Sequence, residues 1–191
     1  MGYTTYFNGS LQFDKPVEEW LVDYISKFSK TRRMKRSPEL IKEAFPNWKE
    51  LCFKGELGKE GEYFVGGLGS WGQNRDVSVL DYNCPARTQP GLWCDWEITE
   101  TELVWNEVEK FYDYEEWLNY LIDNFFAPCG YVLNGDISWE GEESDDFGII
   151  HVENNVVTMQ YGIHVVSMEQ LATSDMIEEL MRRGYAVSKT V

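Results

Sequence analysis

Apolar residues recur along this chain at two different spacings, which predict separate groups of helices and strands. Residues 3–13 are rich in β-branched and aromatic side chains and predict a strand. Apolar positions recur every three or four residues within 14–29 and again within 111–126, as in amphipathic helices. A third, short helix is expected where Ser37 offers an N-cap and Pro38 a first helical position.

Alternating apolar and polar residues predict two β-hairpins. The first joins 92–98 to 102–105 through a polar turn. The second joins 148–153 to 156–161 across Asn154-Asn155, because asparagine tolerates the positive φ that a tight turn requires.

A fourth helix is expected over 174–183, between Ser174 as N-cap and Gly184 as the stop signal. Helices and strands occur in separate blocks along the chain. This order favours one α+β domain over residues 1–191, in which about four helices pack against a largely antiparallel sheet.

Charge divides the chain unevenly. The formal net charge is −16, and residues 1–60 carry 11 Lys/Arg against 9 Asp/Glu, whereas residues 61–191 carry 6 against 24. We therefore expect a near-neutral helical part with a basic loop, followed by a strongly acidic, sheet-rich part. An acidic field repels nucleic acid and attracts basic surfaces, so no direct binding to duplex DNA is expected.

The stretch WEGEESDDF, residues 139–147, concentrates this acidity in a link between two predicted antiparallel strands. It is open to three interpretations: a solvated turn, a metal site, or a surface for a basic partner. The spacing of a calcium loop is absent, and neither His151 nor His164 stands in a metal-binding motif, so no metal is expected. The candidate partner-binding carboxylates are Glu140, Glu142, Glu143, Asp145 and Asp146, with Glu107 and Glu109 beside the neighbouring hairpin. Crowded carboxylates repel one another, so this loop is expected to add nothing to folding.

The run from Lys30 to Arg36 is the basic counterpart of that loop. Five of its seven residues are positively charged. Such a run is usually a solvated connection between helices, and it is also a candidate grip for RNA. Its site residues are Arg32, Arg33, Lys35 and Arg36.

Evidence for catalysis is thin, and whether the protein is an enzyme stays open. The four cysteines form no CxxC pair and are expected to be free thiols, and no nucleophile motif is present. No catalytic residue or cofactor is therefore assigned. An alternative ligand pocket is lined by Trp71, Gln73, Trp93 and Trp96, although most tryptophans are expected in the core.

The N-terminal residues lack the pattern of a signal peptide, and no apolar run approaches the roughly 20 residues of a membrane helix. We expect a cytosolic protein without a membrane partner.

Three stretches of the sequence together resemble an uncharacterised family carried by bacteriophages and prophages. They are TRRMKR (31–36) and the segments 72–96 and 103–157, with QPGLWC (89–94) and EKFY (109–112) as the most specific parts. The resemblance implies a mobile-element origin and the cytosol of a bacterial host, and it carries over no catalytic residues. Small acidic phage proteins are similar in kind to anti-CRISPR and other anti-defence proteins, several of which act on Cas9, whose channels are basic.

The leading hypothesis is therefore an inhibitor that binds a host nuclease complex, with Cas9 and its guide RNA as the best candidate partner. Two alternatives stay open: a sponge for a defence nucleotide signal, and an unrecognised enzyme acting on RNA.

Overall fold

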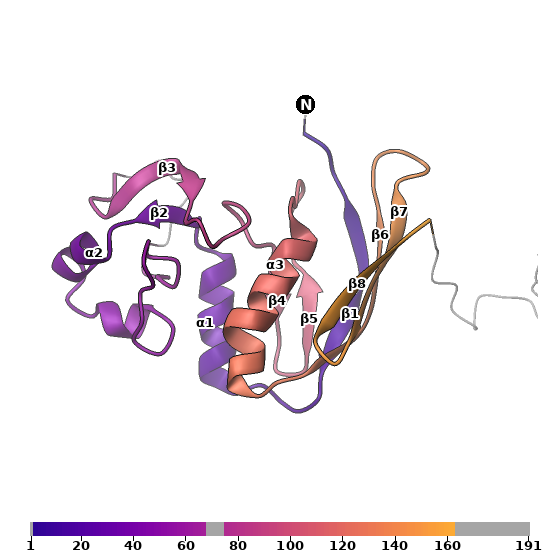
Figure 1. The fold of residues 1–191 in the computed structure, drawn as a ribbon, viewed down its shortest axis with the longest axis horizontal. Coiled ribbons are helices and arrows are strands. Elements are labelled where there is room, and N and C mark those ends of the chain that lie inside the picture. The colour runs from indigo at the N-terminus through magenta and orange to yellow at the C-terminus, as the bar shows by residue number, and fades with distance from the viewer. Residues whose placement is uncertain (1, 68–74, 163–191) are drawn as a thin grey trace, which may run out of the picture.

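The structure, a computed structural model, describes residues 2–67 and 75–162 of the chain. In these ranges it contains a six-stranded antiparallel sheet with the strand order β4-β5-β1-β6-β7-β8, and a separate two-stranded ribbon of β2 and β3 (Figure 1). The strands are β1 (Tyr6–Phe13), β2 (Met34–Arg36), β3 (Val79–Pro85), β4 (Trp96–Ile98), β5 (Glu102–Trp105), β6 (Leu133–Glu140), β7 (Phe147–Glu153) and β8 (Val156–Tyr161). The α-helices are α1 (Glu19–Ser29), α2 (Pro38–Ala44) and α3 (Tyr114–Leu121), with shorter helical segments η1 (Trp48–Leu51), η2 (Ile122–Phe126) and η3 (Ala127–Cys129).

The predicted α+β class with a mainly antiparallel sheet is confirmed. The number of helices is not, since the described residues form three α-helices rather than about four. The helix predicted over 174–183 lies outside the described residues.

Strand β1 lies at the centre of the sheet between two partners that are distant in sequence. It pairs with β5 on one side, where Leu11 faces Leu103, and with β6 on the other, where Tyr6 faces Glu140. Gly9 has a φ of 115°, and a Cβ there would stand 2.7 Å from the carbonyl oxygen of Asp136. Gly9 therefore serves the close approach of two backbones within an unbroken strand.

Helix α3 packs inside the curve of the sheet, because it contacts both edge strands, β4 and β8. Trp117, Leu118 and Phe125 of this helical region belong to one buried cluster with Leu11 and Ile137 of the sheet. The stripe of apolar residues predicted between 111 and 126 thus faces the core, as expected.

Two details of the helix boundaries differ from the prediction. Helix α3 begins at Tyr114, because Asp113 adopts a left-handed φ of 55°. The helix predicted from residue 14 begins at Glu19, and the Oδ1 of Asp14 accepts a hydrogen bond from the Val132 N–H at 2.9 Å.

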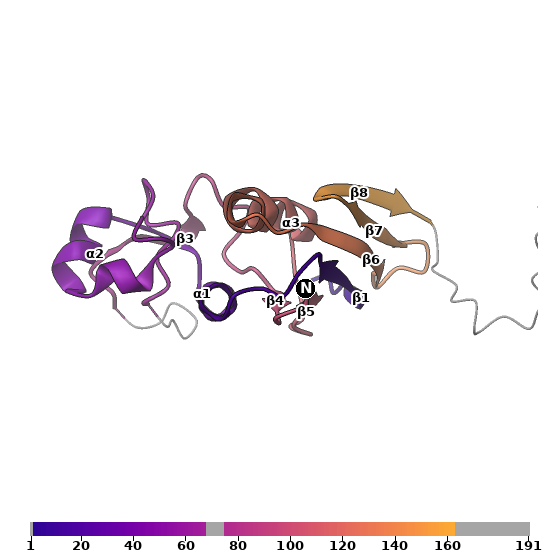
Figure 2. The same ribbon diagram turned by 90° about the horizontal axis from the view of Figure 1, so that it is seen from below.

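Beyond α1 lies a second, smaller unit, which we call the small lobe. It consists of β2, α2, η1, β3 and the described loops between them, and the views in Figures 1 and 2 place it at the end of the molecule opposite β8. Its own buried cluster contains Ile41, Cys52, Leu57 and Phe64. The remainder, the six-stranded sheet with α1 and α3, is called the sheet lobe. Because β2 and β3 pair across residue 60, the two parts distinguished by charge interleave in space.

The predicted turns are present. The hairpin of β4 and β5 turns between Ile98 and Glu102, and that of β7 and β8 turns at Asn154 and Asn155, which have φ values of 51° and 67°. The Ser37 hydroxyl accepts a hydrogen bond from the Leu40 N–H at 3.3 Å, which confirms the predicted cap of α2. Within the described ranges, no helix combines the length and apolar character needed to cross a bilayer.

Candidate functional site

Three segments from distant parts of the sequence meet at one end of the sheet, at the top of Figure 1. They are the N-terminal residues 2–5, the loop 106–113 that follows β5, and the loop 141–146 between β6 and β7. The Tyr3 N–H donates to the Tyr112 hydroxyl at 3.1 Å, and the Tyr3 hydroxyl donates to the carboxylate of Asp146. The Thr4 N–H donates to Oε1 of Glu142 at 2.9 Å. Both predicted acidic loops therefore flank the start of the chain.

This convergence gathers the carboxylates into one region, which we call the acidic end. Helix α3 also begins here, since the ring of Tyr114 lies 4.9 Å from that of Phe7 and 6.2 Å from that of Trp139. Burial raises the pKa of Tyr114, and the negative charges of Tyr161, Asp146, Glu115 and Glu116 raise it further. The acidic end comprises Glu107, Glu109, Asp113, Glu115, Glu116, Glu140, Glu142, Glu143, Asp145 and Asp146. Lys110 of loop 106–113 lies among these carboxylates, and the cluster as a whole is strongly negative and attracts a basic surface.

The carboxylates of loop 141–146 serve two different purposes. Glu142 and Asp146 hold the N-terminal segment, and the hydrogen bond to Asp146 is the main cause of a raised pKa for the Tyr3 hydroxyl. Glu143 and Asp145 are exposed. The expectation that this loop adds nothing to folding is therefore wrong for Glu142 and Asp146, because each satisfies a donor of the N-terminal segment.

Exposed tyrosine rings accompany the carboxylates. Tyr6 is 57% exposed and Tyr112 52% exposed, and both lie beside the acidic loops. Tyr161, 68% exposed, contacts the edge of the Trp139 ring at 5.8 Å between centroids. Tyrosine is enriched at protein interfaces because it combines apolar area with a polar tip. The sequence-based prediction missed these rings; strand alternation is a signal for Tyr6 of β1 and Tyr161 of β8, but not for Tyr112, which lies in a loop.

Two carboxyls among the described residues of the acidic half, Glu62 and Asp95, are buried. Asp95 precedes β4, is 5% exposed, and accepts a long hydrogen bond of 3.4 Å from Nδ2 of Asn106. Burial raises the pKa of Asp95 to about 6. This group therefore titrates close to neutral pH, unlike an ordinary aspartate.

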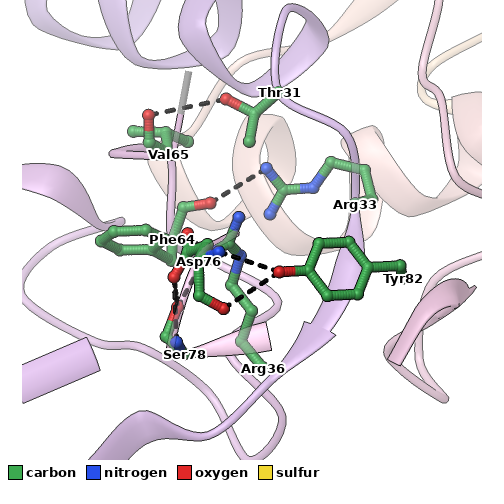
Figure 3. Close-up of polar contacts among 8 residues, drawn as sticks. All are labelled: Thr31, Arg33, Arg36, Phe64, Val65, Asp76, Ser78 and Tyr82. Carbon is green, nitrogen blue, oxygen red and sulfur yellow. Dashed lines mark hydrogen bonds and ion pairs between the residues drawn. The ribbon is translucent and has the colours of Figure 1, made fainter. Parts of the chain in front are cut away.

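The basic run occupies an environment very different from the solvated loop that was expected (Figure 3). Its last three residues form β2 of the small lobe, and Arg33, just before this strand, is 2% exposed. The Arg33 guanidinium donates to the carbonyl oxygens of Phe64 at 3.0 Å and Glu62 at 2.6 Å, and it stacks 4.0 Å from the centre of the Phe28 ring. Burial lowers the pKa of Arg33 to about 10.

Arg36 is equally buried. Its guanidinium forms an ion pair with Asp76 and donates to the Ser78 hydroxyl at 2.7 Å. The Asp76 N–H in turn donates to the Tyr82 hydroxyl at 2.8 Å. Burial alone would raise the pKa of Asp76, but the hydrogen bonds from Arg36 and Ser78 lower it.

The other two members of the run are half-buried. Lys35 forms a 2.6 Å ion pair with Glu60, and Arg32 is also partly covered. Because Arg33 and Arg36 are buried, the run is not the solvated loop that was expected, and RNA binding through Arg32 and Lys35 stays a prediction. The long aliphatic stems of its Arg and Lys side chains pack against apolar groups, and the surrounding carbonyl oxygens accept hydrogen bonds from the charged ends.

Only Trp93 and Trp96 of the alternative ligand pocket lie within the described residues. Trp96 is fully buried, and its Nε1 donates to the carbonyl oxygen of Tyr114 at 3.0 Å, so it belongs to the core. Trp93 is half-buried nearby. Trp71 and Gln73 lie outside the described residues.

The remaining candidate chemistry is sparse. In the described part of the chain, no three His, Cys, Asp or Glu side chains are arranged to hold a metal ion, and the expectation of no bound metal stays a prediction. His151 Nδ1 lies 2.7 Å from Oδ1 of Asp136 across β6 and β7, and His164 lies outside the described residues. The four cysteines are free, and burial raises the pKa of Cys52 to about 11 and that of Cys94 to about 12, which disfavours their reactive thiolate forms.

Comparison of the chain with protein-family models, with curated proteins and with solved structures finds no match. The likeness to phage and prophage proteins stays a prediction based on residues 31–36, 72–96 and 103–157.

Proposed function

We propose that this chain is an anti-defence binding protein that docks its acidic end on a basic, nucleic-acid-binding surface of a host nuclease. The Cas9–guide RNA complex is the first partner to test. The observation that carries the proposal is the meeting of loops 106–113 and 141–146 around residues 2–5, which concentrates ten carboxylates at one end of the sheet.

Electrostatics give this surface its selectivity for a basic partner. Arginine and lysine side chains that line a nucleic-acid channel would meet carboxylates in place of phosphates, and each contact would become a charge-assisted hydrogen bond. Nucleic acid would then be excluded by competition, without any reaction catalysed by the inhibitor.

The acidic end is also held in one shape before binding. Loop 141–146 closes on itself, with the Gly141 N–H donating to the Asp146 carbonyl at 2.7 Å and the Asp146 N–H to the Glu143 carbonyl at 3.0 Å. A preformed loop loses less conformational entropy when it binds. The exposed rings of Tyr6 and Tyr112 would add apolar contact to the charged pairs.

The proposal is tested with three exposed acids that are separate from the folding contacts of Glu142 and Asp146. The variant Glu109→Ser/Glu143→Ser/Asp145→Ser should bind a purified Cas9–guide RNA complex at least tenfold more weakly than the native chain, a loss of about 1.4 kcal/mol. The matched control Glu43→Ser/Glu50→Ser/Glu153→Ser removes the same charge from exposed sites elsewhere and should bind within about twofold of the native chain.

Salt provides an independent readout, because screening acts on the removed charges. Raising the ionic strength should weaken binding of the native chain more than binding of the acidic-end variant. Equal affinities for the variant and its control would exclude the acidic end as the docking surface. Absence of binding by the native chain would exclude Cas9 as the partner.

A further inference from the structure

The small lobe contains a cavity of about 480 Å³ that is separate from the acidic end. Its walls come from α2, η1, the loop 55–59, residues 62–63 and Thr88. This volume falls within the range of roughly 300–1,000 Å³ that is usual for small-molecule sites.

One wall of the cavity combines an aromatic ring with positive charges. Lys42 of α2 places its Nζ 5.3 Å from the centre of the Trp48 ring, and Lys49 places its Nζ 5.7 Å from the same ring. Lys59 adds a further ammonium group to the lining. Lys42 and Lys49 both place their ammonium groups over the Trp48 ring, so a planar base would stack there by displacing these flexible side chains. The displaced Lys42 and the lining Lys59 would then bind an attached anion.

The lining also contains a fixed acceptor. Glu62 is 6% exposed, and its carboxylate accepts the N–H groups of Lys59 at 3.1 Å and Glu60 at 2.7 Å. A carboxylate has about four acceptor sites, so capacity remains for a hydroxyl or amino group of a ligand. Gly58 has a φ of 75°, and a Cβ on it would collide with the Glu62 carboxylate, so the loop can hold this group only with glycine there.

We propose that this cavity binds a nucleotide, with the base on Trp48, the phosphate at Lys42 and Lys59, and a ribose hydroxyl donating to Glu62. A simple anion would use neither the ring nor the fixed acceptor, and a cationic ligand would meet two ammonium groups. Glu56, the other acid of the lining, is exposed and remains in solvent. We thus propose the nucleotide site in the small lobe and not at the tryptophans expected from the sequence. This site is independent of the acidic end.

Isothermal titration calorimetry of the full chain with AMP, adenosine and inorganic phosphate tests the proposal. AMP should bind one site at least tenfold more tightly than either fragment, because only AMP engages the ring and the lysines together. Lys42→Ala, on the exposed surface of α2, should weaken AMP binding at least fivefold, and Trp48→Ala should weaken it further. Lys27→Ala, at an exposed position of α1 that does not line the cavity, should leave it unchanged.

Thermal unfolding of each variant separates lost binding from lost folding, and Lys42→Ala is decisive if Trp48→Ala proves unstable. The proposal is overturned if AMP shows no saturation by about 1 mM. It also fails if phosphate or adenosine alone binds as tightly as AMP, or if Lys42→Ala binds AMP like the native chain. Since the acidic-end variant keeps this cavity intact, it should bind AMP normally even if the proposed nuclease partner fails.

Discussion

Two runs have the same charge density, five charged side chains in seven residues: the basic run 30–36 and the acidic run 140–146. They differ in how far their side chains are exposed to solvent. The acidic run leaves Glu143 and Asp145 in solvent, whereas the basic run buries Arg33 and Arg36.

The difference follows from the chemistry of the side chains and from the neighbours of each run. Thr31 and Met34 of the basic run are buried like Arg33 and Arg36, so most of this segment lies inside the molecule. An arginine brings a long aliphatic stem and five N–H donors, which can satisfy carbonyl oxygens away from water. Carboxylate side chains in a turn between strands are short and have no N–H donors, so they stay hydrated. The density of charge in a sequence therefore does not predict exposure.

The largest effect is expected from removing the buried cation. Arg33→Ala would leave the carbonyl oxygen of Phe64 without this donor and open space above the Phe28 ring, so the free energy of unfolding should fall by roughly 3–5 kcal/mol. Urea denaturation measures the loss. Lys30→Ala in the same run, at a side chain 68% exposed, should change stability by about 0.5 kcal/mol or less. Similar values for the two variants would mean that Arg33 is not a structural residue.

A smaller effect of opposite sign is expected at Asp95, a buried carboxyl of the acidic half. Its folded pKa of about 6 exceeds the usual value of about 3.9, so the folded state binds more protons than the unfolded state between about pH 4 and pH 6. The contribution of Asp95 to the free energy of unfolding therefore falls as the pH rises from about 4 to about 6.

Asp95→Asn removes the free-energy cost of ionising a buried carboxyl. The variant should therefore be more stable than the native protein by about 2 kcal/mol at pH 7, with little difference at pH 4. Urea denaturation at both pH values measures the difference. Asp145→Asn makes the same chemical change at an exposed site and should leave stability at pH 7 within about 0.5 kcal/mol. Equal stabilisation of Asp95→Asn at both pH values would show that ionisation is not the cause.

The smallest effect separates the members of the acidic loop from one another. Glu142→Ser/Asp146→Ser should lower the melting temperature by roughly 2–4 °C, because Tyr3 and Thr4 lose their partners. Glu143→Ser/Asp145→Ser, with the same change of charge, should shift it by about 1 °C or less. Scanning calorimetry resolves the two. If both pairs behave alike, the N-terminal segment is not held by this loop.

Local pattern predicted much of the fold, because strands, hairpin turns and helix caps are specified by nearby residues. The Asn154-Asn155 turn and the Ser37 cap illustrate this. The pattern missed β2, because this strand has three residues and pairs irregularly with the distant β3. The acidic residues were identified from sequence, but their meeting depends on the pairing of Tyr6 with Glu140, which no local signal encodes. The cavity beside Trp48 was missed for the same reason, since α2, η1 and Thr88 become neighbours only after folding.

The central position of β1 has a consequence for synthesis on the ribosome. This strand is made early, but its partner β6 follows about 120 residues later. At translation rates of about 5–20 residues per second, both edges of β1 lack partners until β5 is made, and the edge for β6 stays unpaired for on the order of ten seconds. An unpaired strand is a template for association with other chains, so the nascent protein is most prone to aggregate during this interval. Slower translation before residue 133 would lengthen the exposure, and a chaperone that covers residues 6–13 would shorten it.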